Sequence, residues 1–228
     1  MHISLFHTKP FRDITYCGRF INKSYWSLSF PTGAIDCTHV QIQSPGGPDA
    51  EIYRNRKGVF SINVQAVADP KRKFLSIVAR WFGSAHDSRV FDNSWLRSQL
   101  ESWALPGHLL GDAGYPNLPF LMTPIRNPTS QPEQRFNNAL STTRMPVECM
   151  FGMWKRRFAC LTQKLRTKLT TSLTIIVACA VLHNIAIGHS DLEDDTPISN
   201  EEIIQRPTDS PLGGAVRRTI ILQYFTRQ

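Results

Sequence analysis

The sequence predicts an α/β domain with a mixed sheet, in which antiparallel strands come first, parallel strands follow, and helices flank the sheet. Three observations favour this class. Three segments rich in β-branched and aromatic residues lie between positions 33 and 83, a helical pattern and a further strand follow, and two helical patterns lie between 143 and 187. The length of 228 residues suits one domain, because single cores stop growing near about 250–300 residues. With 41% hydrophobic and 19% charged residues, the composition excludes wholesale disorder.

The first three elements are predicted strands. GAIDCTHVQIQ (33–43) alternates apolar and polar residues and precedes a turn-rich SPGGPD. VFSINVQAVADP (59–70) and KFLSIVARWFG (73–83) are separated by Asp69-Pro70 and three basic residues, which predicts a turn between antiparallel neighbours.

A helix is predicted next, over 84–102, because Ser84 and Asp87 have the spacing of a capping box and an apolar stripe follows. GHLLGDAGY (107–115) is predicted to be a short buried strand that ends at a Gly-Asp-Ala-Gly turn. The stretch 116–132 holds five prolines and is predicted to be mostly loop.

Two longer helices are expected after that loop. In the first, over 143–161, Val147, Phe151, Trp154 and Phe158 fall on one face. The second, over 171–187, is apolar all round and is interrupted only by a few polar residues, so it reads as a buried helix and not as a membrane span. This order of elements is that of the ribonuclease H-like α/β fold.

The chain divides by composition into three parts. Residues 1–32 form a poorly determined lead-in without a secretory signal, and 33–190 form the domain. Residues 191–228 form an acidic tail, in which VRRTIILQYF (216–225) is predicted to be a short terminal helix.

The charge favours a polyanionic partner such as nucleic acid. The net charge is +8, and the stretch 144–168 carries seven bases against one acid. In that stretch Lys155 lies on the side of the predicted helix that carries Glu148 and is favoured for phosphate contact. The alternative is that these bases only form a solvated helix face, since many solvated helices are also basic. The candidate nucleic-acid-binding residues are Lys155, Arg156, Arg157 and Lys164.

The five cysteines are scattered, odd in number and without a CxxC pair. This pattern argues against a disulfide framework and favours a reducing, intracellular compartment. Zinc is disfavoured too, because neither Cys37-Thr38-His39 nor Cys179 with His183 has finger spacing.

Three carboxylates are candidate catalytic and metal-binding residues. Asp36 lies in the middle of an apolar strand, where a charge is costly unless it is paired or bound to metal. Asp112 ends the strand HLLGD, and Glu148 lies at the edge of the basic helix. Gathered together, their oxygens would suit Mg²⁺ or Mn²⁺ and phosphodiester chemistry. By spacing alone, the same three acids could also be helix caps or exposed surface residues. Asp87 is explained by a helix-capping role, and His86 by a structural role.

Seven ordered segments resemble the DDE domain of PIF/Harbinger transposases, and most of all the Harbinger-transposase-derived nucleases of animals. The resemblance covers about residues 33–190, and the segments that carry it are GAIDCTHVQI, YRNRKGVFSINVQAVAD, GSAHDSRVFDNS, LLGDAGYP, LMTPIRNP, RFNNALSTTRMPVECMFGMWKRRFACL and VACAVLHNIAI.

The resemblance implies a ribonuclease H-like fold and divalent-metal-dependent DNA cleavage by a DDE triad. Asp36 in AIDCTH, Asp112 in GDAGY and Glu148 in VECMFG match the family's acids. It also implies DNA and a separate Myb-like DNA-binding protein as partners and a nuclear as well as cytoplasmic location, while the interrupted apolar run over 173–187 predicts no membrane association. A catalytically silent domesticated module that binds DNA or protein on the same fold stays open as the alternative.

The sequence departs from the family pattern in three places. The family carries a helix-turn-helix-like region before its first aspartate, which residues 1–30 do not resemble, so site-specific DNA binding by this chain is not expected. Around Ser29-Phe30-Pro31-Thr32 the lead-in is shorter than in the family, which suggests a truncated or mispredicted gene product. Pro146 lies two residues before Glu148, so we expect the helix either to begin at this proline or to be kinked there.

Overall fold

The computed structural model describes residues 17–19, 31–102, 107–189 and 207–226, and their central feature is a six-stranded sheet in the order β1-β4-β3-β2-β5-β6. The first four strands in this order pair antiparallel, whereas β5 and β6 continue the sheet from β2 in parallel. This confirms the predicted α/β class, the mixed sheet and the antiparallel pairing of 59–70 with 73–83. The strands are β1 (Cys17–Arg19), β2 (Pro31–Gln41), β3 (Ser61–Ala68), β4 (Phe74–Phe82), β5 (His108–Leu110) and β6 (Leu121–Met122).

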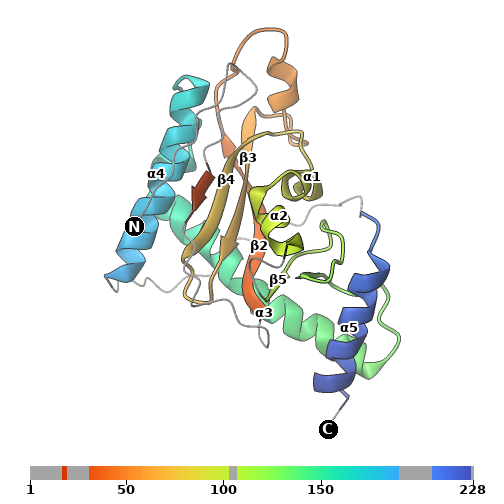
Figure 1. Cartoon of the computed structure of the whole chain (residues 1–228). Helices are drawn as coiled ribbons and strands as arrows, with labels where there is room; N and C mark the ends of the chain where they lie inside the picture. Colours follow the sequence, from red (N-terminus) through yellow and green to blue (C-terminus); the bar gives the residue numbers. More distant parts are fainter. Residues whose placement is uncertain (1–16, 20–30, 103–106, 190–206, 227–228) are drawn as a thin grey trace.

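Helices cover both faces of the sheet (Figure 1). α3 (Gln131–Arg157) and α4 (Leu169–Gly188) pack on one face, where Trp154 and Ile176 join Val64 and Ile77 of the strands in one core. α1 (Asp87–Asp92) and α2 (Trp95–Glu101) pack on the other face around residues such as Ile35. Because successive side chains of a strand point to opposite faces of the sheet, the apolar residues of the strands contribute to two separate cores.

The predicted helix over 84–102 is two short helices, and its predicted capping box is wrong. α1 begins at Asp87 with His86 as its N-cap, and no side chain caps it. Ser94 interrupts the helical run and caps α2, because its hydroxyl accepts the N–H of Arg97 at 3.1 Å.

α3 begins twelve residues before the predicted start at 143. Ser130 and Glu133 form a reciprocal capping box, and a proline lies in the first turn, so the helix begins inside the stretch expected to be loop. Pro146 is an interior residue of this 27-residue helix. Glu148 is therefore held in the middle of a long element and not in a first turn.

α4 is long and apolar enough to cross a membrane by length and composition alone, but in this structure it packs on β4. Two adjacent polar residues fix it there. His183 Nε2 lies 2.9 Å from the carbonyl oxygen of Arg72, and the Asn184 side chain both accepts from and donates to the backbone of Phe74 at 2.8 Å. Two of the polar interruptions of this helix, His183 and Asn184, are thus its attachment points.

The terminal helix is longer than predicted. α5 spans Pro211–Tyr224, and Ile221 packs with Leu110, Met122 and Phe136 beside the start of α3 (Figure 1). Two short 3₁₀ helices, at Ala50–Tyr53 and Ala159–Leu161, complete the described elements. Apart from β1 and the first two residues of β2, the expected lead-in lies outside the described residues, as does the acidic part of the tail up to residue 206.

Candidate active site

The sheet brings Asp36 and Asp112 together. β2 and β5 are parallel neighbours in which Ala34 pairs with Leu110, so two residues further along each chain lie Asp36 and Asp112. Neighbouring strands are about 4.8 Å apart. The Asp112 carboxylate is oriented by a turn, because its Oδ1 accepts the N–H of Gly114 at 2.9 Å. Asp112 follows the end of β5, and its charge acts on Asp36, so two of the three predicted site acids lie near the same end of these neighbouring strands.

Asp36 is a carboxylate in surroundings that disfavour its charge. Its side chain is only 20% exposed, and burial is the main cause that raises its pKa to about 7. The negative charges of Asp112 and Asp87 raise the pKa further, while the Arg144 guanidinium and the N–H of Cys37, which donates to Oδ1 at 2.8 Å, lower it. A cation bound beside Asp36 would favour the charged form of its carboxylate.

Arg144 is the one protein cation that the structure pairs with Asp36, among the described residues. A terminal guanidinium nitrogen lies 3.3 Å from Asp36 Oδ2, and the residue is 8% exposed. Arg144 is one turn before Glu148 on α3, so both side chains project from the same side of the helix. Sequence reasoning missed this residue, because it counted Arg144 only as part of a basic stretch.

Glu148 is half-buried on α3, one turn beyond Arg144. Among the described residues, no three His, Cys, Asp or Glu side chains lie close enough to hold a metal ion together. In this geometry Asp36 and Asp112 belong to neighbouring segments of the sheet, and Arg144 pairs with Asp36. Glu148 lies on the next turn of α3 after Arg144.

A second polar group lies on the opposite face of β2, and Asp87 belongs to it. Asp87 Oδ1 accepts the side-chain N–H of Asn63 at 3.0 Å, and the Cys37 thiol lies 3.3 Å from the Tyr115 hydroxyl. Burial raises the pKa of both Cys37 and Tyr115. The carboxylate that was expected to cap a helix is therefore part of the surroundings of the site, and its charge reaches Asp36.

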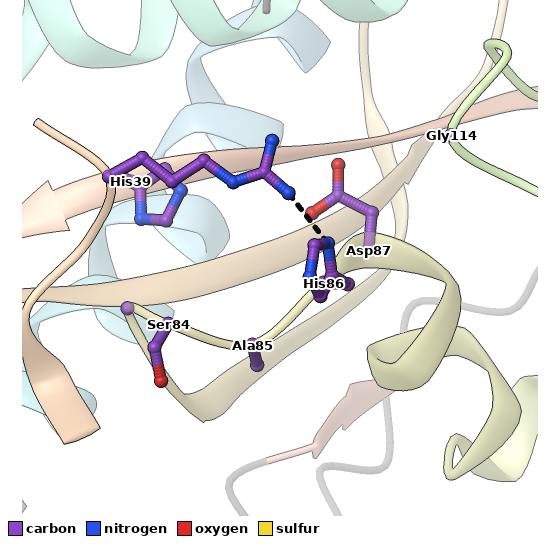
Figure 2. Close-up of a pocket in the computed structure, with 8 residues that line it drawn as sticks. His39, Ser84, Ala85, His86, Asp87 and Gly114 are labelled. Carbon is purple, nitrogen blue, oxygen red and sulfur yellow. Dashed lines mark hydrogen bonds between the residues drawn. The ribbon is translucent and has the colours of Figure 1, made fainter. Parts of the chain in front are cut away.

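A small hollow opens beside Asp87, and Figure 2 draws the residues that line it. Arg56 closes one side of it with a 2.8 Å contact between its guanidinium and His86 Nδ1. The residues that line it are His39, Arg56, Gly83, Ser84, Ala85, His86, Asp87 and Gly114.

The predicted nucleic-acid-binding residues are not gathered on one exposed surface. Lys155 points at the sheet, and its Nζ donates to the Thr38 hydroxyl at 2.7 Å and to the carbonyl oxygen of His39 at 2.9 Å. Burial lowers its pKa to about 8, and the nearby Lys57 lowers it further. Arg156 and Lys164 are exposed, and Arg157 is half-buried on the side of His183.

The residues considered for zinc have other partners. Cys37 contacts Tyr115, while His39 Nδ1 lies 3.0 Å from the Ser61 hydroxyl. His183 is fully buried and contacts the backbone of Arg72. The four cysteines whose side chains the structure describes are free thiols.

Comparison with known proteins gives one family. The model described as DDE superfamily endonuclease matches residues 35–184. The human protein named "Putative nuclease HARBI1" is 37% identical over 166 residues, which are 69% of this chain and 46% of that protein. The rat protein of the same name is 37% identical over 208 residues, 85% of this chain and 58% of its own length. "Protein ALP1-like" of Arabidopsis thaliana is 32% identical over 190 residues, 74% of this chain and 46% of that protein. No solved structure matches.

A mixed sheet that brings two aspartates together, within a family match of this extent, defines the class of the protein: the chain belongs to the DDE superfamily endonucleases. Within that class, the relatives named HARBI1 confirm the resemblance to Harbinger-derived nucleases. The chain spans about half the length of these relatives, 46–58% in the matches given above.

Proposed function

We propose that this chain is a divalent-metal-dependent DNA endonuclease of transposase descent, a hydrolase that cuts phosphodiester bonds with Asp36, Asp112 and Glu148. The observation that carries the proposal is the placement of Asp36 on β2 and of Asp112 two residues beyond β5, the parallel neighbour of β2, where burial and the charge of Asp112 both raise the pKa of Asp36. Perturbed acids of this kind are frequent at functional sites. Membership of the DDE endonuclease family supports the same reaction.

The proposal includes a ribonuclease H-like fold. The order β4-β3-β2-β5-β6 has antiparallel strands on one side of β2 and parallel strands on the other, and helices cover both faces. This is the element order that the sequence led us to expect for that fold.

The residues present fit a hard divalent cation. Asp36 and Asp112 offer carboxylate oxygens, which Mg²⁺ and Mn²⁺ prefer. Burial and the charge of Asp112 raise the pKa of Asp36, and a cation bound there would offset both effects. Asp36 and Asp112 would hold the cation, and Glu148 would have to turn toward it to complete the set. A bound cation would stabilise the charge that develops on the phosphate oxygens.

The chain's own residues have distinct tasks in this proposal. β2 and β5 fix the two aspartates relative to each other, and α3 carries Glu148 toward them, where it would also orient the attacking oxygen. Arg144 balances the charge of Asp36 and would have to release it when the site is filled. Lys155 fastens α3 to β2 near Asp36 through Thr38.

The alternative is a catalytically silent module that binds DNA or protein on the same scaffold. Two observations favour it: Arg144 already pairs with Asp36, and the described residues contain no three-ligand metal cluster. We also propose DNA and a Myb-like DNA-binding protein as partners, with a nuclear and cytoplasmic location, on the strength of family resemblance and the basic charge alone.

Nicking of supercoiled plasmid by purified protein, with Mg²⁺ or Mn²⁺ and with Asp112→Asn as the matched variant, separates the two functions. We expect metal-dependent nicking that falls by at least about a hundredfold in Asp112→Asn, because the substitution removes an anionic ligand. Circular dichroism should show the same fold for both proteins. Folded wild-type protein that cuts with neither metal, or a variant that cuts as well as wild type, would refute the nuclease.

A further inference from the structure

Two cysteine thiols from separate elements meet beside the core that α3 and α4 form on the sheet. Cys160 belongs to the short 3₁₀ helix at Ala159–Leu161, which follows the end of α3, whereas Cys179 lies on α4. The two side chains share a hydrogen bond. Because they lie far apart in the sequence and have no CxxC spacing, only the packing of the two elements brings them together.

The segment that carries Cys160 is held in place on both sides. Leu161 is 2% exposed and belongs to the same core cluster as Cys179, and Phe158 packs against that cluster. The N–H of Leu161 donates to the carbonyl oxygen of Phe158 at 2.8 Å. Further along, the N–H of Leu165 donates to the last residue of β2 at 2.9 Å. The contact between the two thiols is therefore a fixed feature of the fold.

The two thiols differ in their access to solvent. Cys160 is exposed, whereas Cys179 is 6% exposed. Burial is the main cause that raises the pKa of Cys179 to about 12, and the neighbouring Cys160 raises it further. Cys179 therefore stays protonated at neutral pH, and Cys160 is the thiol of the two that a dissolved oxidant reaches. Cysteines that respond to oxidants are accessible to solvent and often lie next to a second cysteine that resolves the oxidised form.

We propose that Cys160 and Cys179 are a peroxide-sensitive thiol pair that forms a reversible disulfide between α4 and the segment after α3. Hydrogen peroxide oxidises the Cys160 thiol to a sulfenic acid and is itself reduced to one molecule of water. The Cys179 sulfur then attacks the Cys160 sulfur and the S–S bond forms. The sulfenic oxygen leaves as a second molecule of water, which takes up the thiol proton of Cys179. A dithiol reductant returns the two electrons and two protons.

The disulfide would join the two helices that cover this face of the sheet. The segment with Cys160 begins where α3 ends, and α4 is attached to the sheet through His183 and Asn184. A covalent link between them restricts the unfolded chain. This inference goes beyond the proposed nuclease function and does not depend on it.

The test is peptide mapping of the folded full-length protein. Reduced protein is treated with hydrogen peroxide, the remaining thiols are blocked with N-ethylmaleimide, and the protein is digested with trypsin without reductant. Cleavage after Lys and Arg releases Cys160 in peptide 158–164 and Cys179 in peptide 169–206, and neither peptide holds another cysteine. We expect mass spectrometry to find these two peptides joined in most of the protein, and to find them separate after treatment with dithiothreitol.

Single variants test the two roles. In Cys179→Ala, dimedone, which reacts with sulfenic acids, should label Cys160, because no second thiol resolves it. In Cys160→Ser, Cys179 should stay unlabelled because it is buried. The matched control is Cys149→Ala, which removes another buried thiol and should leave the link between the two peptides unchanged. The mapping of wild-type protein does not depend on whether these variants fold.

Three results would overturn the proposal: peptides that stay separate in peroxide-treated wild type, a link from Cys160 mainly to another cysteine, or dimedone labelling of Cys179 in place of Cys160. Thermal melts add a further check. The oxidised protein should melt at the temperature of the reduced protein or above it, because the thiols are already in contact and the link restricts the unfolded chain. A lower melting temperature would show that the bond distorts the fold, and it would contradict the proposal.

Discussion

At the scale of single residues, the buried Asp36 carboxylate sets the properties of the site. Its pKa is raised to about 7 chiefly by burial, and the neighbouring acids outnumber the one guanidinium that offsets them. A raised carboxyl pKa means that the folded protein binds more protons than the unfolded chain between about pH 4 and 7. Ionisation of Asp36 therefore lowers the free energy of unfolding as the pH rises through this window. Functional groups are often kept although they reduce the stability of the fold in this way.

Metal affinity should follow the titration of Asp36. Below pH 7 a cation must displace the proton, so the affinity for Mn²⁺ should fall about tenfold per pH unit, and it should level off above pH 7. Arg144→Met should shift this break to higher pH, because the positive charge of Arg144 lowers the pKa of Asp36, whereas Arg144→Lys should keep it near wild type. Calorimetric titrations with Mn²⁺ between pH 5.5 and 8.5 measure the break; a flat profile would contradict the role given to Asp36.

The sequence pointed to three acids as candidates, but it did not indicate which residues surround them. Asp36 and Asp112 stand out because each interrupts or ends an apolar strand. Arg144 does not stand out, since its contact with Asp36 spans 108 residues and depends on how α3 crosses β2. The contact of Lys155 could not be predicted either. A helical wheel places Lys155 on the side of Glu148, but only the packing of α3 on the sheet shows that it binds Thr38.

At the scale of elements, the two capping patterns show why helix starts were hard to predict. Ser84 with Asp87 and Ser130 with Glu133 have the same spacing, yet only the second pair forms a capping box. Asp87 instead binds Asn63 across the sheet, so tertiary contacts override the local pattern. The true start of α3 was concealed by four prolines upstream of it, by Pro132 in its first turn and by the polar first half of the helix.

Pro146 should destabilise α3. An interior proline removes one helical hydrogen bond, here to the carbonyl of Thr142, and costs about 3 kcal/mol. We therefore expect Pro146→Ala to raise the free energy of unfolding by about 1–3 kcal/mol in urea titrations. Pro132→Ala, in the first turn, should change it by less than about 0.5 kcal/mol, because no helical bond is missing there. Lower stability of Pro146→Ala would show that the proline is needed for packing.

The attachment of α4 should be sensitive to acid. Burial is the main cause that lowers the pKa of His183 to about 4, so the fold keeps this ring neutral. The unfolded chain takes up the proton first, so the contribution is complete above about pH 6.5 and is lost as the pH falls toward 4, by up to about 3 kcal/mol. His183→Gln can keep a bond to Arg72 without titrating. The stability difference between wild type and this variant should therefore shrink over that window, and a constant difference would contradict the assignment.

At the scale of the whole molecule, the order of strands and helices was predictable because each element has a strong pattern of its own. What local patterns did not indicate is the contribution of distant segments: β1 adds a sixth strand at the edge, and α5 packs against α3 and β6.

The relation to longer relatives defines how far the proposed function extends. The chain covers 46–58% of the HARBI1 proteins it matches, and the family match covers residues 35–184. The proposed chemistry lies wholly within that match, since Asp36, Asp112 and Glu148 are all inside it. Choice of a DNA target and recruitment of a Myb-like protein are properties of a whole protein. For this chain, DNA and a Myb-like protein are therefore only proposed partners.

The most direct test of the central claim is anomalous diffraction from crystals soaked with Mn²⁺. We predict a single strong peak within bonding distance of Asp36 and Asp112, with Glu148 turned toward it and the Arg144 guanidinium moved away from Asp36. Crystals that stay well ordered at saturating Mn²⁺, show no peak at this place and keep Arg144 on Asp36 would contradict the account.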